Sequence, residues 1–300
     1  MRWPLLTPVL RERTPEHLRA DGEKDLRPLA VWESHGMVLE AVRSRAGVFL
    51  VLPLLGVLLT PSIAAALGEG SDGTLGIFGD RDARVFYAAE TEELVVALTI
   101  DDSPDPDTTP ALLELLAEYD VKATFFVIAS QVPGNEPLLL HLVEAGHEVG
   151  NHMAHDRPSI QLSPETFERQ LLYTKRMIAP FGGNRWFRPG SGYYDGAMLD
   201  LLDLHGYRCV LGTVYPVDAH IPWSRFAARW ILWRSRPGAV IILHDRGKRG
   251  ERMLKTLEWV LPRLQESGYR FVTLSELIAI DERQGVVGQG SHDSRTNEEP

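Results

Sequence analysis

Short apolar runs alternate with amphipathic helical segments between Leu94 and Ile278, and this alternation is the strongest constraint on the fold. Apolar runs bounded by helices are typical of strands in a parallel sheet, because helices cover both faces of such a sheet. Repeated strand–helix units predict an α/β fold with a parallel sheet, either open and doubly wound or closed into a barrel. The expected strands are 94–100, 122–128, 147–150, 186–188, 208–214, 239–243 and 270–273.

The ends of the expected helices carry capping signals. A threonine and a serine each precede a proline, as in an N-cap followed by proline in the first turn. Glycines stand just beyond three helical runs, where a left-handed C-cap residue is needed. The residues concerned are Thr109, Ser163, Gly146, Gly206 and Gly268.

The N-terminal region has a different composition. Residues 1–45 are polar and of mixed charge, which predicts disorder, whereas residues 46–67 contain no charged side chain. A run of that length is enough to span a bilayer as a helix, and Arg43 and Arg45 before it favour a cytoplasmic N-terminus. The alternative is a buried hydrophobic hairpin of the soluble domain.

Residues 46–67 are therefore interpreted as a transmembrane helix or a signal peptide. The small residues ending at Ala66 resemble a cleavage site, and translation from Met37 instead of Met1 would give an ordinary signal peptide. Both interpretations predict an extracytoplasmic protein, either membrane-anchored or secreted. Residues 68–280 would form the catalytic domain, and the polar residues 281–300 a disordered tail.

Charge and cysteine content exclude several classes of function. The formal net charge of −10 argues against a nucleic-acid partner, because nothing would offset the repulsion of phosphates. Cys209 is the only cysteine, which rules out an intramolecular disulfide or a cysteine zinc cluster. It lies in an apolar run and is expected to be a buried thiol.

The protein is expected to be a monomer.

Polar residues follow five of the expected strands. In parallel α/β folds the reactive groups gather at the carboxyl ends of strands, so these side chains are expected on one rim. Carboxylates, imidazoles and one guanidinium supplied together from five strands indicate an active site. They are Asp101, Asp102, His152, His155, Asp156, Arg188, Asp218, His244 and Asp245.

This mixture of Asp and His suits a divalent metal such as Zn²⁺. Two adjacent carboxylates cannot both lie on one face of a strand end, so one of Asp101 and Asp102 can bind metal while the other faces the substrate. That division provides a Lewis acid beside a general base. Arg188 can hold the base ionised, and His244 can protonate a leaving nitrogen.

At this point the chain resembles the polysaccharide deacetylase family with the NodB-type catalytic domain, carbohydrate esterase family 4, in a divergent, chitin-deacetylase-like branch. Five motifs in order carry the resemblance. TIDDSP at 99–104 resembles TFDDGP, GNH at 150–152 with Pro158 resembles GNH…HP, RPGSG at 188–192 resembles RPPYG, VD at 217–218 with Trp223 resembles VDxxDW, and IILHD at 241–245 resembles LLHD.

The resemblance implies a distorted (β/α)7 barrel and assigns roles to the rim residues. Asp101 would be the general base, Asp102 and His152 metal ligands and His244 the general acid. Arg188 would orient Asp101, and Asp218 would tune His244. Backbone N–H groups near Ser191 would stabilise the oxyanion.

One departure concerns the third metal ligand. The family's second histidine stands four residues after the first, and here Asp156 takes that position while His155 stands three after. Asp156 is the first choice, with His155 as the alternative. A carboxylate would make the site harder, so Zn²⁺ is expected with Co²⁺, Mn²⁺ or Ni²⁺ as alternatives. Ser103 and Ser191 replace the family's Gly and Tyr.

The predicted function is hydrolytic N-deacetylation of amino sugars in a glycan of the chitin, chitooligosaccharide or peptidoglycan type, a reaction on a linear amide. One alternative keeps the chemistry and changes the substrate to a lipid-linked or small acyl or formyl amide. Another is a glycan-binding relative without activity. The exact glycan and acyl group are not encoded in any recognisable motif.

Overall fold

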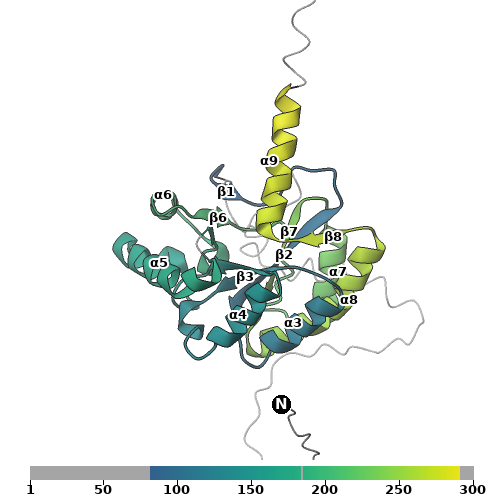
Figure 1. Cartoon of the computed structure of the whole chain (residues 1–300), viewed down its shortest axis with the longest axis horizontal. Helices are drawn as coiled ribbons and strands as arrows, with labels where there is room; N and C mark the ends of the chain where they lie inside the picture. Colours follow the sequence, from purple (N-terminus) through teal and green to yellow (C-terminus); the bar gives the residue numbers. More distant parts are fainter. Residues whose placement is uncertain (1–81, 184, 291–300) are drawn as a thin grey trace, which may run out of the picture. The chain divides into compact units, whose positions relative to one another are not determined.

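The computed structural model describes residues 82–183 and 185–290, which form an α/β fold (Figure 1). The predicted polar segment 1–45, the apolar segment 46–67 and residues 291–300 lie outside this range. Among the described helices, none combines the length and apolar character needed to cross a membrane.

All strand pairs in the sheet are parallel, which confirms the predicted α/β class. The order is β1-β6-β5-β4-β3-β2-β7, and β8 pairs with the first half of β2 beside β3. The strands are β1 (Val85–Phe86), β2 (Val95–Ser103), β3 (Thr124–Val127), β4 (Glu148–Asn151), β5 (Trp186–Phe187), β6 (Arg208–Val210), β7 (Ala239–His244) and β8 (Arg270–Val272).

Single bridges join the two ends of this strand order. Val214, beyond β6, pairs in parallel with Ile241 of β7, and Ala88, beyond β1, pairs antiparallel with Ala239. The sheet is therefore barrel-like with an irregular seam, in agreement with the barrel alternative and not with an open doubly wound sheet.

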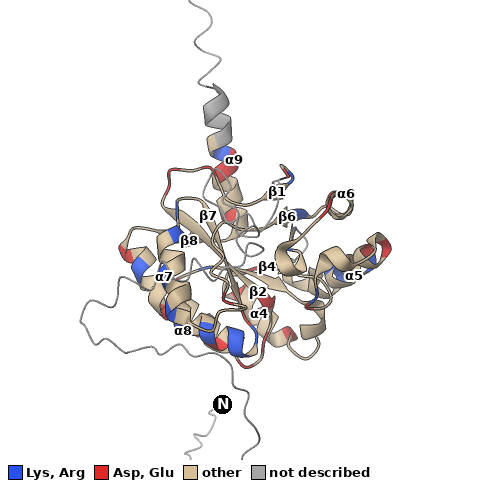
Figure 2. Ribbon diagram, turned by 180° about the vertical axis from the view of Figure 1, so that it is seen from behind, with Lys and Arg blue, Asp and Glu red and all other residues tan. Residues whose placement is uncertain are grey.

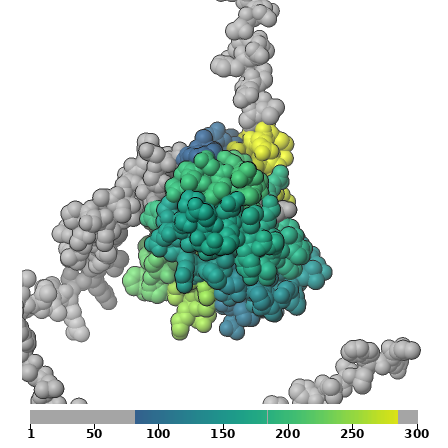
Figure 3. Space-filling view, turned by 90° about the vertical axis from the view of Figure 1, so that its left-hand side faces the viewer, coloured from purple at the N-terminus to yellow at the C-terminus, as the bar shows by residue number. Residues whose placement is uncertain are grey.

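Helices surround the sheet (Figure 1). Figure 3 views the side on which α5 and α6 lie in Figure 1, where segments from the middle of the sequence cover the surface. The helices are α3 (Thr109–Glu118), α4 (Glu136–Glu144), α5 (Pro164–Ile178), α6 (Gly196–Leu204), α7 (Ser224–Arg234), α8 (Gly247–Glu266) and α9 (Leu274–Gly290), with short 3₁₀ turns η1 (Ala129–Gln131), η2 (Ser159–Gln161), η3 (Ala179–Phe181) and η4 (Gly190–Gly192).

Strand β2 orients the first acidic residue by its alternation. Val96, Leu98 and Ile100 join the core that packs against the surrounding helices. Val95 and Ala97 join a second core, which includes residues of α9. Because side chains alternate along a strand, Asp101 points to the same side as Val95 and Ala97, the inside of the barrel.

Most capping predictions are confirmed, and one is corrected. Ser163 caps α5 by accepting a bond from Thr166 N–H, and the glycines after α4, α6 and α8 have left-handed φ values of 85°, 74° and 86°. Thr109 is already the first residue of α3, so Thr108 is the N-cap residue. Its side chain makes no capping bond, because its hydroxyl donates to the buried Asp245 carboxylate instead.

Two boundaries also differ from expectation. Strand β1 was not predicted, since Val85 and Phe86 are too few to show a periodic pattern. Helix α9 continues through Asp281, where a polar tail was expected to begin, and ends at Gly290. Its first turns pack through Leu274 and Leu277 into the second core, the one that contains Val95 and Ala97.

Candidate active site

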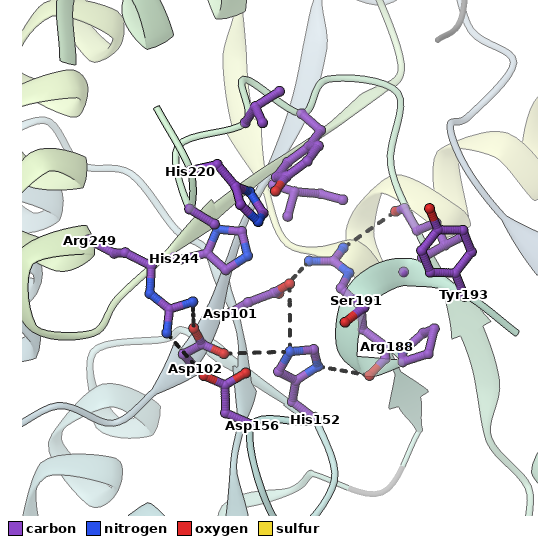
Figure 4. Close-up of a pocket in the computed structure, with 17 residues that line it drawn as sticks. Asp101, Asp102, His152, Asp156, Arg188, Ser191, Tyr193, His220, His244 and Arg249 are labelled. Carbon is purple, nitrogen blue, oxygen red and sulfur yellow. Dashed lines mark hydrogen bonds and ion pairs between the residues drawn. The ribbon is translucent and has the colours of Figure 1, made fainter. Parts of the chain in front are cut away.

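A pocket of about 510 Å³ opens at the carboxyl ends of the strands (Figure 4). Six of the predicted site residues line it, together with the first turn of α8. They are Asp101, Asp102, His152, Asp156, Arg188 and His244. Most of the rim predicted from strand ends therefore lines one pocket, whereas His155, Asp218 and Asp245 do not line it.

Asp101 and Asp102 both line the pocket, which corrects the expectation that they would face opposite ways. The pairing of β2 with β3 shifts register between Asp101 and Ser103, and Asp102 between them has a left-handed φ of 71°. Such a bulge redirects a side chain that strict alternation would turn away. Both carboxylates can therefore act in the same site.

Asp101 is held by Arg188 in a buried ion pair. Arg188 Nη1 lies 2.7 Å from Asp101 Oδ1 and also donates to Thr99 Oγ1 at 2.8 Å. The guanidinium is fixed further by the Val210 carbonyl, 3.1 Å from Nε, and by the Phe126 ring, 4.1 Å below it. Burial would raise the pKa of Asp101, but the charge and hydrogen bond of Arg188, together with the charges of His152 and His244, hold that pKa below its ordinary value.

His152 faces both carboxylates. Its Nδ1 lies 2.8 Å from the backbone carbonyl of Arg188, which can only accept a hydrogen bond, so Nδ1 carries the proton. In the neutral ring Nε2 therefore presents a lone pair, 3.9 Å from Asp101 Oδ2 and 3.7 Å from Asp102 Oδ1. Three electron-rich atoms thus face one another, an arrangement that attracts a cation.

His244 is paired with Asp218 behind the pocket wall. Asp218 Oδ1 lies 3.0 Å from His244 Nδ1, and Asp218 Oδ2 accepts the backbone N–H of His244, also at 3.0 Å. Burial would lower the pKa of His244, but the Asp218 carboxylate, with smaller contributions from Asp101 and Asp102, raises it to about 9. The ring is therefore protonated at neutral pH and can donate a proton from Nε2.

Asp156 lies at the pocket edge in contact with two arginines. Arg249 Nη2 is 3.0 Å from Asp156 Oδ2, and Arg246 Nη1 is 3.4 Å from the same oxygen. The neighbouring His155 is exposed and does not line the pocket. Position thus favours Asp156 over His155 as the residue that can reach the site.

Asp245 does not belong to the pocket. Its carboxylate is fully buried and accepts bonds from the hydroxyls of Ser103, Thr108 and Thr109. Burial raises its pKa to about 6, although these hydroxyls oppose the shift. Asp245 therefore ties the end of β7 to the start of α3 and keeps β2 in place.

Several residues that line the pocket were not predicted from the sequence. Tyr193, Tyr215 and His220 come from loops after β5 and β6, and Arg249 comes from the first turn of α8. The basic run 246–252 directly after the IILHD motif was a signal for Arg249. Figure 2 shows Lys and Arg along α8.

Left-handed backbone is concentrated around the pocket. Asp102, Ser191 and Val217 line it with φ values of 71°, 67° and 58°, and Met153, directly after His152, has a φ of 70°. Such conformations cost of order 1–3 kcal/mol each and persist where the surroundings impose them. Their clustering here is typical of a functional site.

Comparisons with known proteins agree with the fold and the pocket. The profile of the polysaccharide deacetylase family matches residues 88–210. Peptidoglycan-N-acetylglucosamine deacetylase of Bacillus cereus is 33% identical over 202 residues, which are 65% of this chain and 92% of that protein. The chain belongs to the polysaccharide deacetylase family. It is thereby an amide-acting hydrolase, as the sequence predicted.

Two similar solved structures bear on metal binding and on activity. A family 4 acetyl xylan esterase from Clostridium thermocellum, in complex with a cobalt ion, is 30% identical, with a TM-score of 0.58 over 62% of this chain and 91% of that chain. A mutant of a CE4 family pseudoenzyme from Bacillus anthracis with restored activity is also 30% identical, with a TM-score of 0.60 over 66% of this chain and 72% of that chain.

The family generally uses a divalent metal, and the donors present here fit one in part. Asp102 Oδ2 is buried and accepts no hydrogen bond from the described residues, although Arg249 Nη1 lies 3.0 Å from it, and the lone pair of His152 Nε2 faces the same carboxylate. Within residues 82–183 and 185–290, however, no three Asp, Glu, His or Cys side chains form a complete metal cluster. Asp102 and His152 are suitable ligands, and Asp156 is held aside by its arginines.

Proposed function

We propose that this chain removes N-acetyl groups from amino sugars of a glycan by hydrolysis. The observation that supports this most is that one pocket holds two complementary groups side by side. Asp101, a carboxylate kept ionised by an arginine, and His244, an imidazole kept protonated by a carboxylate, are register partners on the neighbouring strands β2 and β7. Amide hydrolysis needs both, a base for water and an acid for the leaving nitrogen.

Asp101 acts as the general base in this proposal. Arg188 keeps its carboxylate ionised, so Oδ2 can accept a proton from a water molecule as the water oxygen attacks the acetyl carbonyl. A tetrahedral oxyanion results. Arg188 also restrains the carboxylate through Oδ1, which leaves Oδ2 directed into the pocket.

His244 then acts as the general acid. It donates its Nε2 proton to the amine nitrogen as the C–N bond breaks, and the products are acetate and the free amino sugar. Asp218 holds the opposite ring nitrogen and stabilises the imidazolium before that transfer.

A divalent metal, proposed as Zn²⁺ with Co²⁺, Mn²⁺ or Ni²⁺ as alternatives, would be held by Asp102 and His152 with Asp156 as the third ligand. When bound it would supply a Lewis acid and lower the pKa of the attacking water. The Arg188 carbonyl supports the ligand role of His152, because it fixes the tautomer with Nε2 free.

The oxyanion would be stabilised by backbone near Ser191. In the turn η4 the Gly190 N–H donates to Ser159 Oγ and the Gly192 N–H donates to the Pro189 carbonyl. The Ser191 amide, held at a left-handed φ of 67°, is therefore the candidate donor. Because the backbone amide would bind the oxyanion, the side chain of Ser191 could contact the substrate.

The substrate class follows from the relatives and from the walls of the pocket. Leu211 and Ile242 are apolar lining residues suited to the acetyl methyl group, and Tyr193, which is half exposed at the rim, offers a ring for a sugar face. The peptidoglycan deacetylase relative makes N-acetylglucosamine in peptidoglycan the first substrate to test. We also propose that the protein acts outside the cytoplasm, with residues 46–67 serving as a transmembrane anchor or a signal peptide.

The test is acetate release by the purified full chain with added Zn²⁺ or Co²⁺. The substrates are peptidoglycan, chitooligosaccharides, a small acyl amide and acetylated xylan, the last because a similar structure is an acetyl xylan esterase. We expect release from the amino-sugar glycans and its loss in Asp101→Asn. Metal-loaded protein that cleaves only the ester or only the small amide would refute the substrate assignment.

One observation favours a second function, a glycan-binding protein without activity. The residue proposed as third ligand, Asp156, is engaged by Arg249 and Arg246, so the metal site is not complete. Metal analysis separates the two functions. A binding protein would retain glycan affinity and take up no metal at any concentration tested.

A further inference from the structure

Arg249 connects the two carboxylates proposed as metal ligands (Figure 4). Its Nη1 lies 3.0 Å from Asp102 Oδ2, and its Nη2 lies 3.0 Å from Asp156 Oδ2. One guanidinium thus engages both acids, each through one nitrogen. The family motifs found in the sequence include no residue with this role.

The contact with Asp102 places a cation directly on a buried carboxylate oxygen. Asp102 Oδ2 accepts no hydrogen bond from the described residues, and within them the ion pair at 3.0 Å with Arg249 is its direct charged contact. A buried carboxylate without a cation is costly. The protein without metal therefore has a strong reason to keep Arg249 in place.

A divalent cation bound to Asp102 and His152 would compete with that arrangement. It would approach the carboxylate that Arg249 contacts, and two positive charges a few Å apart repel each other. The same cation needs Asp156 as a third ligand, and Arg249 holds Asp156 as well. Arg249 thus opposes metal binding at two ligands.

We propose that Arg249 is a built-in competitor of the metal, which occupies Asp102 and Asp156 in the metal-free protein and must release them before the third ligand can bind. This inference rests on the proposed metal-dependent function. It assigns to Arg249 control over metal affinity and makes Asp156 a conditional ligand.

Release requires a change of the Arg249 side chain rather than of helix α8. The helix start is anchored by Gly247 N–H, which donates to Asp105 Oδ2 at 3.0 Å. At Gly250 a Cβ atom would lie 2.5 Å from Thr108 Oγ1, so the helix packs directly against the N-cap of α3. The Arg249 side chain is 27% exposed and can turn toward solvent.

The chain offers a matched control in Arg246. It contacts the same Asp156 oxygen at 3.4 Å and does not line the pocket. Arg246→Gln therefore removes a nearby positive charge and a contact to Asp156, yet leaves the bridge to Asp102 intact. A difference in metal affinity between the Arg249 and Arg246 variants therefore reports the contact of Arg249 with Asp102 and Asp156, and not the general loss of a positive charge.

The experiment measures Zn²⁺ and Co²⁺ affinity of the metal-stripped full chain by calorimetry, with the Co²⁺ absorption bands as a second readout. Arg249→Gln should bind each metal about tenfold more tightly or better, because one opposing charge is gone. Arg246→Gln should change affinity by less than about threefold, since its charge is farther from Asp102. Circular dichroism checks that each variant is folded.

Asp156 is tested in both backgrounds. Asp156→Asn should cost more affinity in the Arg249→Gln protein than in the wild type, because only there is the carboxylate free to bind. Equal losses, or an Arg249→Gln protein that binds metal no better than wild type, would overturn the inference. So would a failure of both proteins to bind metal.

These outcomes are distinguishable from a failure of the proposed function. Metal affinity is measured without any glycan substrate, so tighter binding by Arg249→Gln supports the competitor whether or not acetate is released. Absence of deacetylation by metal-loaded wild type would refute the proposed reaction and leave the competitor standing.

Discussion

Asp218 engages His244 twice, through the backbone N–H and through Nδ1, each at 3.0 Å. The two contacts fix both the position of the ring at the end of β7 and its charge. Because the second contact favours the protonated ring, the pKa of His244 is raised from 6.5 to about 9. This relationship determines the pH range in which His244 can act as an acid.

Asp218→Asn should shift the alkaline limit of activity. His244 donates a proton only while protonated, so the wild type should lose kcat/KM as pH rises through about 9. Without the Asp218 carboxylate its charge and hydrogen bond no longer offset burial, so the pKa of His244 falls and the loss should begin at lower pH. A pH profile of kcat/KM tests this, and an unmoved alkaline limb would contradict the acid role.

The same pair should make stability depend on pH. The raised pKa means that the folded protein binds the proton more tightly than the unfolded chain. Stabilisation from this pair is therefore fully present below pH 6.5 and is lost as pH rises through about 9. Urea unfolding at pH 6 and pH 9.5 should show a smaller difference in Asp218→Asn than in the wild type.

Asp101→Asn should remove the group that accepts a proton from water while keeping the size and shape of the side chain. We expect kcat to fall by about 10²- to 10⁴-fold, the usual contribution of a general base. Binding of a glycan product should be retained, because the amide still pairs with Arg188. A variant with more than about a tenth of wild-type kcat would exclude Asp101 as the base.

Arg188→Met should destabilise the fold as well as the site. It would leave Asp101 buried without its cation, and breaking a buried pair in this way costs about 3–5 kcal/mol. Asp101→Asn in the same chain should recover part of the loss, because the unpaired charge disappears. Chemical denaturation of the three variants measures this, and strictly additive losses would contradict the pairing.

Gly250→Ala should lower stability through contact with the α3 N-cap. The added Cβ would lie 2.5 Å from Thr108 Oγ1, and overpacking of this kind costs about 1–3 kcal/mol. Gly196→Ala is the control, since a Cβ there meets nothing within 4 Å and alanine favours the helix. Thermal unfolding should show a lower Tm only for the first variant.

Much of the site was predictable because its residues follow strands directly. Once the strands are parallel, their carboxyl ends must meet, so Asp101, His152, Arg188 and His244 converge whatever the details of packing. The caps at Ser163 and at the glycines were predictable for a similar reason, since they depend on a few neighbouring residues. The apolar segment 46–67 stays a prediction.

Other features arise from contacts between distant segments and carry no local signal. The register shift at Asp102 depends on how β2 pairs with β3, and it turns both acids into the pocket. Asp245, which the IILHD motif placed on the rim, is drawn away by the Thr108 and Thr109 hydroxyls. Strand β1 forms by pairing in parallel with β6, which is far away in the sequence.

The sequence by itself thus determined the parallel α/β class, the order of the motifs and the set of side chains at the strand ends, because alternation and spacing are local properties. Only the tertiary structure decided the direction of Asp102, the partner of Asp156 and the position of Arg249. The first depends on how β2 pairs with β3, and the other two depend on where the first turn of α8 meets the loops that follow the strands, which no short stretch of residues encodes.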